Sequence, residues 1–251
     1  MVFSSLTFLF LFLPAVLLVY YCVPSFQGKD RGHGFFSSHV LRNLVLFLFS
    51  LLFYAWGEPV YVVLMIFSTL VDYFHGMLVH RFRGTKKAKI ALISSVVINL
   101  GLLCEFKYSD FVVANLNALL GTAIPQPNLP LPIGISFYTF QTMSYTIDVY
   151  RGDTKMQKNI ISFGAYVALF PQLIAGPIVR YSTVAEQLDH RRESIDQFSD
   201  GIQRFITGLG KKVLIANNVG MVWSQLSALP EGQTSVLGSW IALFAFFFQI
   251  Y

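Results

Sequence analysis

Long apolar runs recur along the chain, and each is close to the length of a membrane-crossing helix. A hydrocarbon core about 30 Å thick requires about 20 apolar residues per helix. We therefore predict an all-α, polytopic membrane protein folded as a helical bundle. The predicted membrane segments are residues 6–23, 41–56, 59–79, 90–106, 131–150, 160–179 and 236–251.

The composition agrees with this class and excludes others. The chain of 251 residues is 55% hydrophobic and only 12% charged, whereas soluble domains are about 25% charged. These values exclude a soluble globular enzyme, a disordered chain and a nucleic-acid-binding protein. The net charge of +5 is explained by basic loops on one side of a membrane.

Basic residues gather in alternate loops between the apolar runs. Basic loops remain in the cytoplasm, so this pattern predicts an external N-terminus. The intervening loops hold only Lys107. The basic loop residues are Lys29, Arg31 and Arg42, then Arg81, Arg83, Lys86, Lys87 and Lys89, then Arg151, Lys155 and Lys158.

The run at 160–179 breaks this alternation, because a simple membrane crossing would place the basic residues after it outside. It contains Pro171 and Pro177, and each proline removes an amide donor and interrupts a helix. Broken backbone at membrane depth requires cover from protein or a cavity. We therefore predict a re-entrant segment near 160–180 that returns Arg180 to the cytoplasm.

Two further stretches are helical candidates that do not cross the membrane. Residues 195–225 mix apolar and charged side chains at near-helical spacing, which predicts an amphipathic helix at the membrane surface or in a protein groove. Residues 111–120 are apolar but too short to cross. We expect them to lie in the interface or to enter the membrane partway.

Several polar residues lie inside apolar runs. Asp72 and His75 are three residues apart on one helix face. Ionisable groups within membranes commonly mark function, but this pair is close to a basic loop, and we favour a hydrated position near the cytoplasmic end. Asn99 is predicted to hydrogen-bond between helices. The hydroxyl-rich stretch 137–146, which includes Gln141, either lines a channel or makes ordinary interhelical hydrogen bonds.

Signatures of soluble catalytic and metal sites are absent from the sequence. Residues 208–212, GLGKK, lack the first glycine and the Ser/Thr of a phosphate-binding loop. The sequence has no HExxH motif. Cys22 and Cys104 have no neighbours at metal-ligand spacing, so neither a metal site nor a disulfide framework is predicted.

Five short stretches form a more specific pattern. They are MVFSS at 1–5, LFYAWG at 52–57, LPIGISFYTFQ at 131–141, FPQLIAGPIVRY at 170–181 and GLGKK at 208–212. Together they resemble the bacterial membrane-bound O-acyltransferases (the MBOAT family), specifically the branch of the alginate O-acetyltransferases. The D-alanyl transferases of teichoic acid synthesis are related, so D-alanyl transfer to teichoic acid is an alternative within the family.

The resemblance implies a multi-pass enzyme of the bacterial inner membrane with a pore-like cavity. Such an enzyme passes an acyl group from a cytoplasmic donor to an exopolysaccharide such as alginate. The implied donor substrate is acetyl-CoA or an acyl carrier thioester, with no bound cofactor and no metal. The implied partners are membrane lipid, the polysaccharide acceptor and periplasmic acetylation proteins, and no nucleic acid is involved.

The expected catalytic histidine of the family has no match among the histidines of this chain, so we assign no catalytic residue. We interpret residues 1–251 as the N-terminal part of a single, incomplete MBOAT domain. The resemblance implies a cavity-wall or donor-binding role for six candidates: Gln141, Pro171, Gln172, Gly176, Pro177 and Arg180. Arg180 either binds a donor phosphate through charge-assisted hydrogen bonds or only anchors the chain at lipid headgroups.

Two other function classes stay open. Broken helices and polar residues at membrane depth are also features of transporters and flippases, although the sequence shows no internal repeat. A non-catalytic membrane scaffold is the third alternative. Acetyl transfer or donor hydrolysis distinguishes the acyltransferase from the other two, and flux of an unmodified substrate identifies a transporter.

Overall fold

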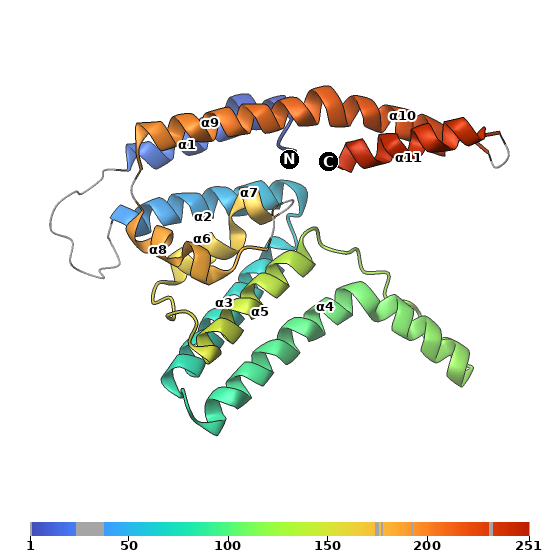
Figure 1. Ribbon diagram of the computed structural model, residues 1–251. Coiled ribbons are helices and arrows are strands. Elements are labelled where there is room, and N and C mark those ends of the chain that lie inside the picture. The colour runs from blue at the N-terminus through green and yellow to red at the C-terminus, as the bar shows by residue number, and fades with distance from the viewer. Residues whose placement is uncertain are drawn as a thin grey trace. The chain divides into compact units, whose positions relative to one another are not determined.

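Every regular element in the part of the chain that the structure describes is a helix (Figure 1). This computed structural model describes residues 2–23, 38–173, 176, 178–191, 193–230 and 233–250. Three of the described helices, α2 (Ser38–Gly57), α3 (Val62–Arg81) and α4 (Lys86–Leu120), are long and apolar enough to cross a membrane. The predicted class, an all-α polytopic membrane protein, is confirmed.

The helices form two compact units, one of residues 12–191 and one of residues 2–11 with 192–251. A π-helical stretch, η1 (Phe8–Phe12), precedes α1. The first unit contains α1 (Leu13–Cys22), α2 (Ser38–Gly57), α3 (Val62–Arg81), α4 (Lys86–Leu120), α5 (Ile135–Arg151), α6 (Ile160–Ala168), α7 (Phe170–Leu173) and α8 (Tyr181–His190).

Helix α4 corrects one prediction. The stretches 90–106 and 111–120 were expected to be separate, but both lie in this single helix of 35 residues. Residues 107–110 between them are polar and include neither proline nor glycine. They therefore contain no residue that breaks a helix. At 1.5 Å per residue, α4 is about 52 Å long, more than the roughly 30 Å of a bilayer core.

Within the first unit, α3, α4 and α5 pack against one another, and α2 packs against α6. Two helices can approach closely where one of them carries a glycine at the contact, because glycine has no side chain. A Cβ added at Gly164 of α6 would lie 2.8 Å from the ring of Phe47 on α2. A shared core joins the two groups of helices, and its buried aromatic residues are Tyr54, Tyr73, Tyr138, Tyr145, Phe163, Tyr166 and Tyr181.

The segment 160–180 is broken into short helices. Helix α6 has nine residues, too few to cross a membrane, and Leu169 leaves the helical conformation between α6 and α7. A helix continued through Pro171 would place the proline ring against the carbonyl of residue 167. Pro171 instead lies exposed in the first turn of α7. The re-entrant path remains a prediction, and Pro177 lies outside the described residues.

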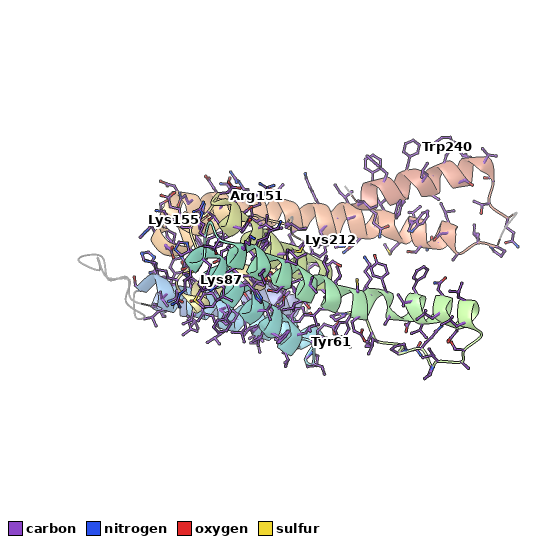
Figure 2. All side chains as sticks on the ribbon, turned by 90° about the horizontal axis from the view of Figure 1, so that it is seen from below. Tyr61, Lys87, Arg151, Lys155, Lys212 and Trp240 are labelled. Atoms are coloured by element: carbon purple, nitrogen blue, oxygen red, sulfur yellow. The ribbon has the colours of Figure 1, made fainter. Side chains whose placement is uncertain are left out.

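The basic loops at 81–89 and 151–158 lie at one end of the first unit (Figure 2), and Lys29 and Arg31 fall outside the described residues. Arg83 Nη2 donates to the carbonyl oxygen of Arg151 at 3.3 Å. Figure 2 shows Lys87, Arg151 and Lys155 towards one end of this unit and Tyr61 towards the other. This arrangement is what the positive-inside rule requires of a cytoplasmic end.

The second unit contains α9 (Ile195–Gly210), η2 (Lys211–Ala216), α10 (Asn217–Ser227) and α11 (Val236–Ile250). Helix α9 begins after Ser194, whose Oγ accepts from the backbone amide of Gln197 at 3.2 Å. Helix α10 packs against α11, with the rings of Trp223 and Phe246 4.9 Å apart. Helices α9, η2 and α10 cover the predicted amphipathic stretch 195–225. Its position at a membrane surface stays a prediction.

Candidate functional site

Asp72 on α3 is completely buried, and neighbouring helices supply hydrogen bonds to its carboxylate. Asn99 Nδ2 of α4 donates to Oδ2 at 2.8 Å, and Thr146 Oγ1 of α5 donates to Oδ1 at 3.2 Å. Ser95 Oγ of α4 also donates to Oδ1. Burial of a carboxylate is costly unless it is hydrogen-bonded. These donors therefore tie α3, α4 and α5 together around one acidic group.

The hydrated position predicted for Asp72 is therefore wrong. Helices α4 and α5 cover this face of α3 and bring side-chain donors to it, which sequence position alone did not reveal. His75 is half-buried, and its ring nitrogens contact Val71 O at 2.7 Å and Ser94 Oγ at 2.9 Å. The interhelical hydrogen bonding predicted for Asn99 is confirmed, because Ser68 Oγ of α3 also donates to its Oδ1 at 3.1 Å.

The polar residues of α5 make interhelical hydrogen bonds. Besides the bond from Thr146 to Asp72, Gln141 Nε2 donates to the carbonyl oxygen of Tyr166 on α6 at 3.0 Å. Gln141 is only 2% exposed. Of the two interpretations of the stretch 137–146, these contacts match interhelical hydrogen bonding rather than a channel lining.

The start of α5 lies against α7 and the end of α2, and we call this region the motif junction. Gly134 has a φ of 78°, and a Cβ there would lie 3.0 Å from the carbonyl oxygen of Leu173. Glycine fits this left-handed, closely approached position without strain. Tyr54 Oη of α2 donates to Ile133 O at 2.9 Å. Three of the stretches that carry the family resemblance therefore meet here.

Two polar atoms near the motif junction are buried and have no hydrogen-bond partner among the described residues. They are the hydroxyl of Tyr138 and Nε2 of Gln172. The great majority of buried polar groups are paired, so these two require an explanation. Along α5, Tyr138 is about 20 Å from Arg151 at 1.5 Å per residue, and so lies far from the basic end.

The remaining sequence candidates lie in different surroundings. The Gly176 amide donates to Gln172 O at 3.0 Å, which forms a local turn after α7. Arg180 is exposed and immediately precedes α8. Across the described ranges, no hydrogen bond connects Gln141, Gln172 and Arg180. Nor does any group of three or more His, Cys, Asp or Glu in those ranges present a metal site.

Sequence reasoning missed a polar network at the basic end. The backbone amide of Gln157 donates to Tyr145 Oη at 3.0 Å. Gln157 Nε2 donates to Tyr181 Oη at 2.9 Å and to Asp189 Oδ1 at 3.2 Å. Burial, followed by the nearby Asp189 carboxylate, raises the pKa of Tyr181, so its phenol stays neutral. Gln157 lies in a loop, and no periodic pattern marked it in advance.

A second contact fixes α8 to the same unit. Asn43 of α2 donates through Nδ2 to Ser162 Oγ at 2.8 Å and to Leu188 O at 2.9 Å. Arg191 Nη1 in turn donates to Asn43 Oδ1 at 2.8 Å. Together with the bonds from Gln157, these contacts hold α8 beside the basic loop 151–158, at the end that the sequence predicts to be cytoplasmic.

The chain is similar over its whole length to curated proteins. It is 40% identical over 256 residues to the probable alginate O-acetylase AlgI of Pseudomonas aeruginosa and 38% identical to that of Azotobacter vinelandii. It is 27% identical over 278 residues to the peptidoglycan O-acetyltransferase of Helicobacter pylori. These alignments cover 46%, 48% and 51% of the relatives, so the chain spans about half their length. No protein-family model and no solved structure matches the chain.

Proposed function

We propose that this chain belongs to the family of the alginate O-acetylases, the branch of the membrane-bound O-acyltransferases that its motifs resemble, and that the protein is an O-acetyltransferase that acts on a polysaccharide. The observation that carries the proposal is whole-length identity of 38–40% to proteins named for alginate O-acetylation. The relative named for peptidoglycan O-acetylation supports the broader class. None of these names supports a transporter or a scaffold.

In the finer proposal, the acetyl group moves across the bacterial inner membrane. A thioester donor, acetyl-CoA or an acyl carrier, delivers it from the cytoplasm to an exopolysaccharide such as alginate, and periplasmic proteins complete the transfer. Support comes from the placement of the basic loops at one end of the first unit and the motif junction away from them. D-alanyl transfer to teichoic acid is the second candidate within the family.

The chemistry requires a carbonyl carbon, an attacking hydroxyl oxygen and a base. The acceptor oxygen attacks the thioester carbonyl, the thiol leaves, and the hydroxyl proton passes through the base. No histidine of this chain matches the family's catalytic one, so we assign the base to none of its residues. The described units supply the membrane scaffold and the motif junction.

The proposal is tested in the host bacterium. Deletion of the gene is expected to abolish ester-linked acetate on the exported polysaccharide, measured by proton NMR, and the wild-type gene is expected to restore it. Unchanged acetate in the deletion strain would exclude the function. Loss of ester-linked alanine instead would identify D-alanyl transfer. Loss of unmodified polysaccharide from the medium would identify a flippase.

The direction of transfer is tested in sealed membrane vesicles. Radiolabelled acetyl-CoA is supplied either to the face that carries the loops at 81–89 and 151–158 or to the opposite face. Label is expected to reach the polysaccharide only from the first face. Equal transfer from both faces would contradict a cytoplasmic donor but not the acetyltransferase itself.

A further inference from the structure

We propose that the hydroxyl of Tyr138 is a substrate-binding group that donates a hydrogen bond to the carbonyl oxygen of the acetyl group being transferred. This inference rests on the proposed O-acetyltransferase function. Tyr138 makes and breaks no covalent bond in this role. It holds and polarises the carbonyl oxygen while the acceptor attacks.

The first argument is the contrast between Tyr138 and the other tyrosines of the same core. Within the described residues Tyr138 is 1% exposed, and its hydroxyl has no hydrogen-bond partner. Every other tyrosine of this core cluster has a partner. The hydroxyls of Tyr54, Tyr73 and Tyr166 donate to the carbonyl oxygens of Ile133, Lys158 and Val179, and those of Tyr145 and Tyr181 accept from Gln157.

The second argument is position. Tyr138 lies in the first turn of α5, four residues after Gly134, which approaches the carbonyl oxygen of Leu173 on α7. Gln172, the residue before Leu173 in α7, presents the other buried polar atom that has no partner among the described residues. Two unsatisfied polar side chains therefore come from two of the motifs that carry the family resemblance. A buried donor without a partner is rare in native proteins, and a ligand that arrives during turnover supplies the missing acceptor.

The third argument is the chemistry of the surroundings. The other core residues at the motif junction are Tyr54, Ile135 and Leu173, all uncharged. Burial of a phosphate or carboxylate group of a ligand in such apolar surroundings would cost free energy unless a cationic side chain paired with it. A small neutral group with one strong acceptor oxygen fits better, and an acetyl ester or thioester is such a group. A hydrogen bond from a desolvated donor strengthens as the carbonyl oxygen gains negative charge in the transition state.

The test compares two Tyr→Phe variants of the protein as produced from its own gene in its host membrane. Tyr138→Phe removes the unpartnered hydroxyl. Tyr54→Phe is the matched control, because it removes a hydroxyl that donates to Ile133 O in the same core. Acetyl transfer to polysaccharide is measured as kcat and KM in membranes with acetyl-CoA as the probe donor. The thermal unfolding midpoint is measured in detergent.

For Tyr138→Phe we expect kcat to fall by about 10²-fold, with an unfolding midpoint equal to or above that of the wild type. For Tyr54→Phe we expect a lower midpoint, because a made hydrogen bond is lost. Two results would overturn the inference: Tyr138→Phe with kcat within twofold of the wild type, or a fall in its midpoint matching that of Tyr54→Phe. An inactive wild-type protein would instead refute the proposed function, and the inference with it.

Discussion

Asp72 of α3 and Asn99 of α4 form a 2.8 Å hydrogen bond in which neither side chain is more than 1% exposed. Asn99 is bound on both sides, because its Oδ1 accepts from Ser68 while its Nδ2 donates to the carboxylate. Its amide therefore determines whether the carboxylate of Asp72 is fully hydrogen-bonded. A buried carboxylate that loses a donor has no water to replace it.

Replacement of Asn99 by leucine is expected to destabilise the protein by about 3 kcal/mol, because it leaves the buried carboxylate short of a donor. Asn115→Leu on the same helix is the control. Asn115 is exposed, and within the described residues its side chain bonds only to Phe111 O one turn earlier, so a change within about 0.5 kcal/mol is expected. Denaturant unfolding in detergent measures both, and equal losses would contradict the structural role of the Asp72–Asn99 bond.

The approach of α3 to α5 depends on Gly76. A Cβ at this position would lie 2.7 Å from Cε1 of Tyr145, and that ring is held by the hydrogen bond that its hydroxyl accepts from Gln157. Gly76→Ala is expected to cost about 1–3 kcal/mol through overpacking. Gly101→Ala meets no heavy atom within 4 Å and is expected to be neutral or to stabilise by up to about 1 kcal/mol. A neutral Gly76→Ala in the same unfolding assay would show that α3 and α5 separate easily.

Tyr181 gives the protein a specific alkaline sensitivity. Its pKa is raised from 10.0 by burial and then by Asp189, so the folded protein holds the phenolic proton more tightly than the unfolded chain does. The resulting stability is fully present below pH 10 and declines as the pH rises above it. Above about pH 10, we expect the unfolding midpoint of Tyr181→Phe to fall less steeply than that of the wild type, whereas below pH 10 the two slopes are expected to be the same.

The control for this pH profile is Tyr150→Phe, because Tyr150 is exposed at the end of α5. Its midpoint is expected to follow the wild-type slope. Tyr181→Phe is also expected to be about 1 kcal/mol less stable at neutral pH, because it loses the hydrogen bond from Gln157. Parallel slopes for all three proteins would show that Tyr181 does not dominate the alkaline loss.

The hydrogen bonds of the first unit also predict its topology. Arg83 contacts Arg151, and Gln157 contacts Asp189 of α8. In a cysteine-free background, single cysteines at Lys87, Lys155 and Glu186 are therefore expected to react with a membrane-impermeant reagent from one side only. A cysteine at Gln126, in the loop after α4, is expected to react from the other side. Labelling of residue 186 together with residue 126 would exclude the re-entrant path.

The sequence predicted the helices best where an apolar run is bounded by turn residues. Residues 41–56 and 59–79 lie within or close to the bounds of α2 and α3, because Gly57, Glu58 and Pro59 separate them clearly. The prediction failed for α4, because polar residues at 107–110 do not by themselves end a helix. Helix ends require a residue that breaks or caps the helix, such as Gly121 with its left-handed φ of 64°.

The candidate residues were predicted less completely. Gln141 and Gln172 were among the six cavity-wall or donor-binding candidates that the family resemblance implied, but nothing in the sequence distinguished Tyr138 from its neighbours. The lack of a partner for its hydroxyl among the described residues is a property of the packed core, since five other core tyrosines do have partners. The sequence shows which residues carry hydroxyl groups, but only the structure shows which of these groups have a hydrogen-bond partner.

The all-α membrane class and the basic end followed from the sequence itself, because transfer into lipid depends on apolar content and charge along a short segment of chain. The surroundings of Asp72 were decided only by tertiary structure. Its donors Asn99 and Thr146 are 27 and 74 residues away in the chain. They reach it because α3, α4 and α5 pack together, and the hydrogen bonds of a buried carboxylate depend on which helices meet.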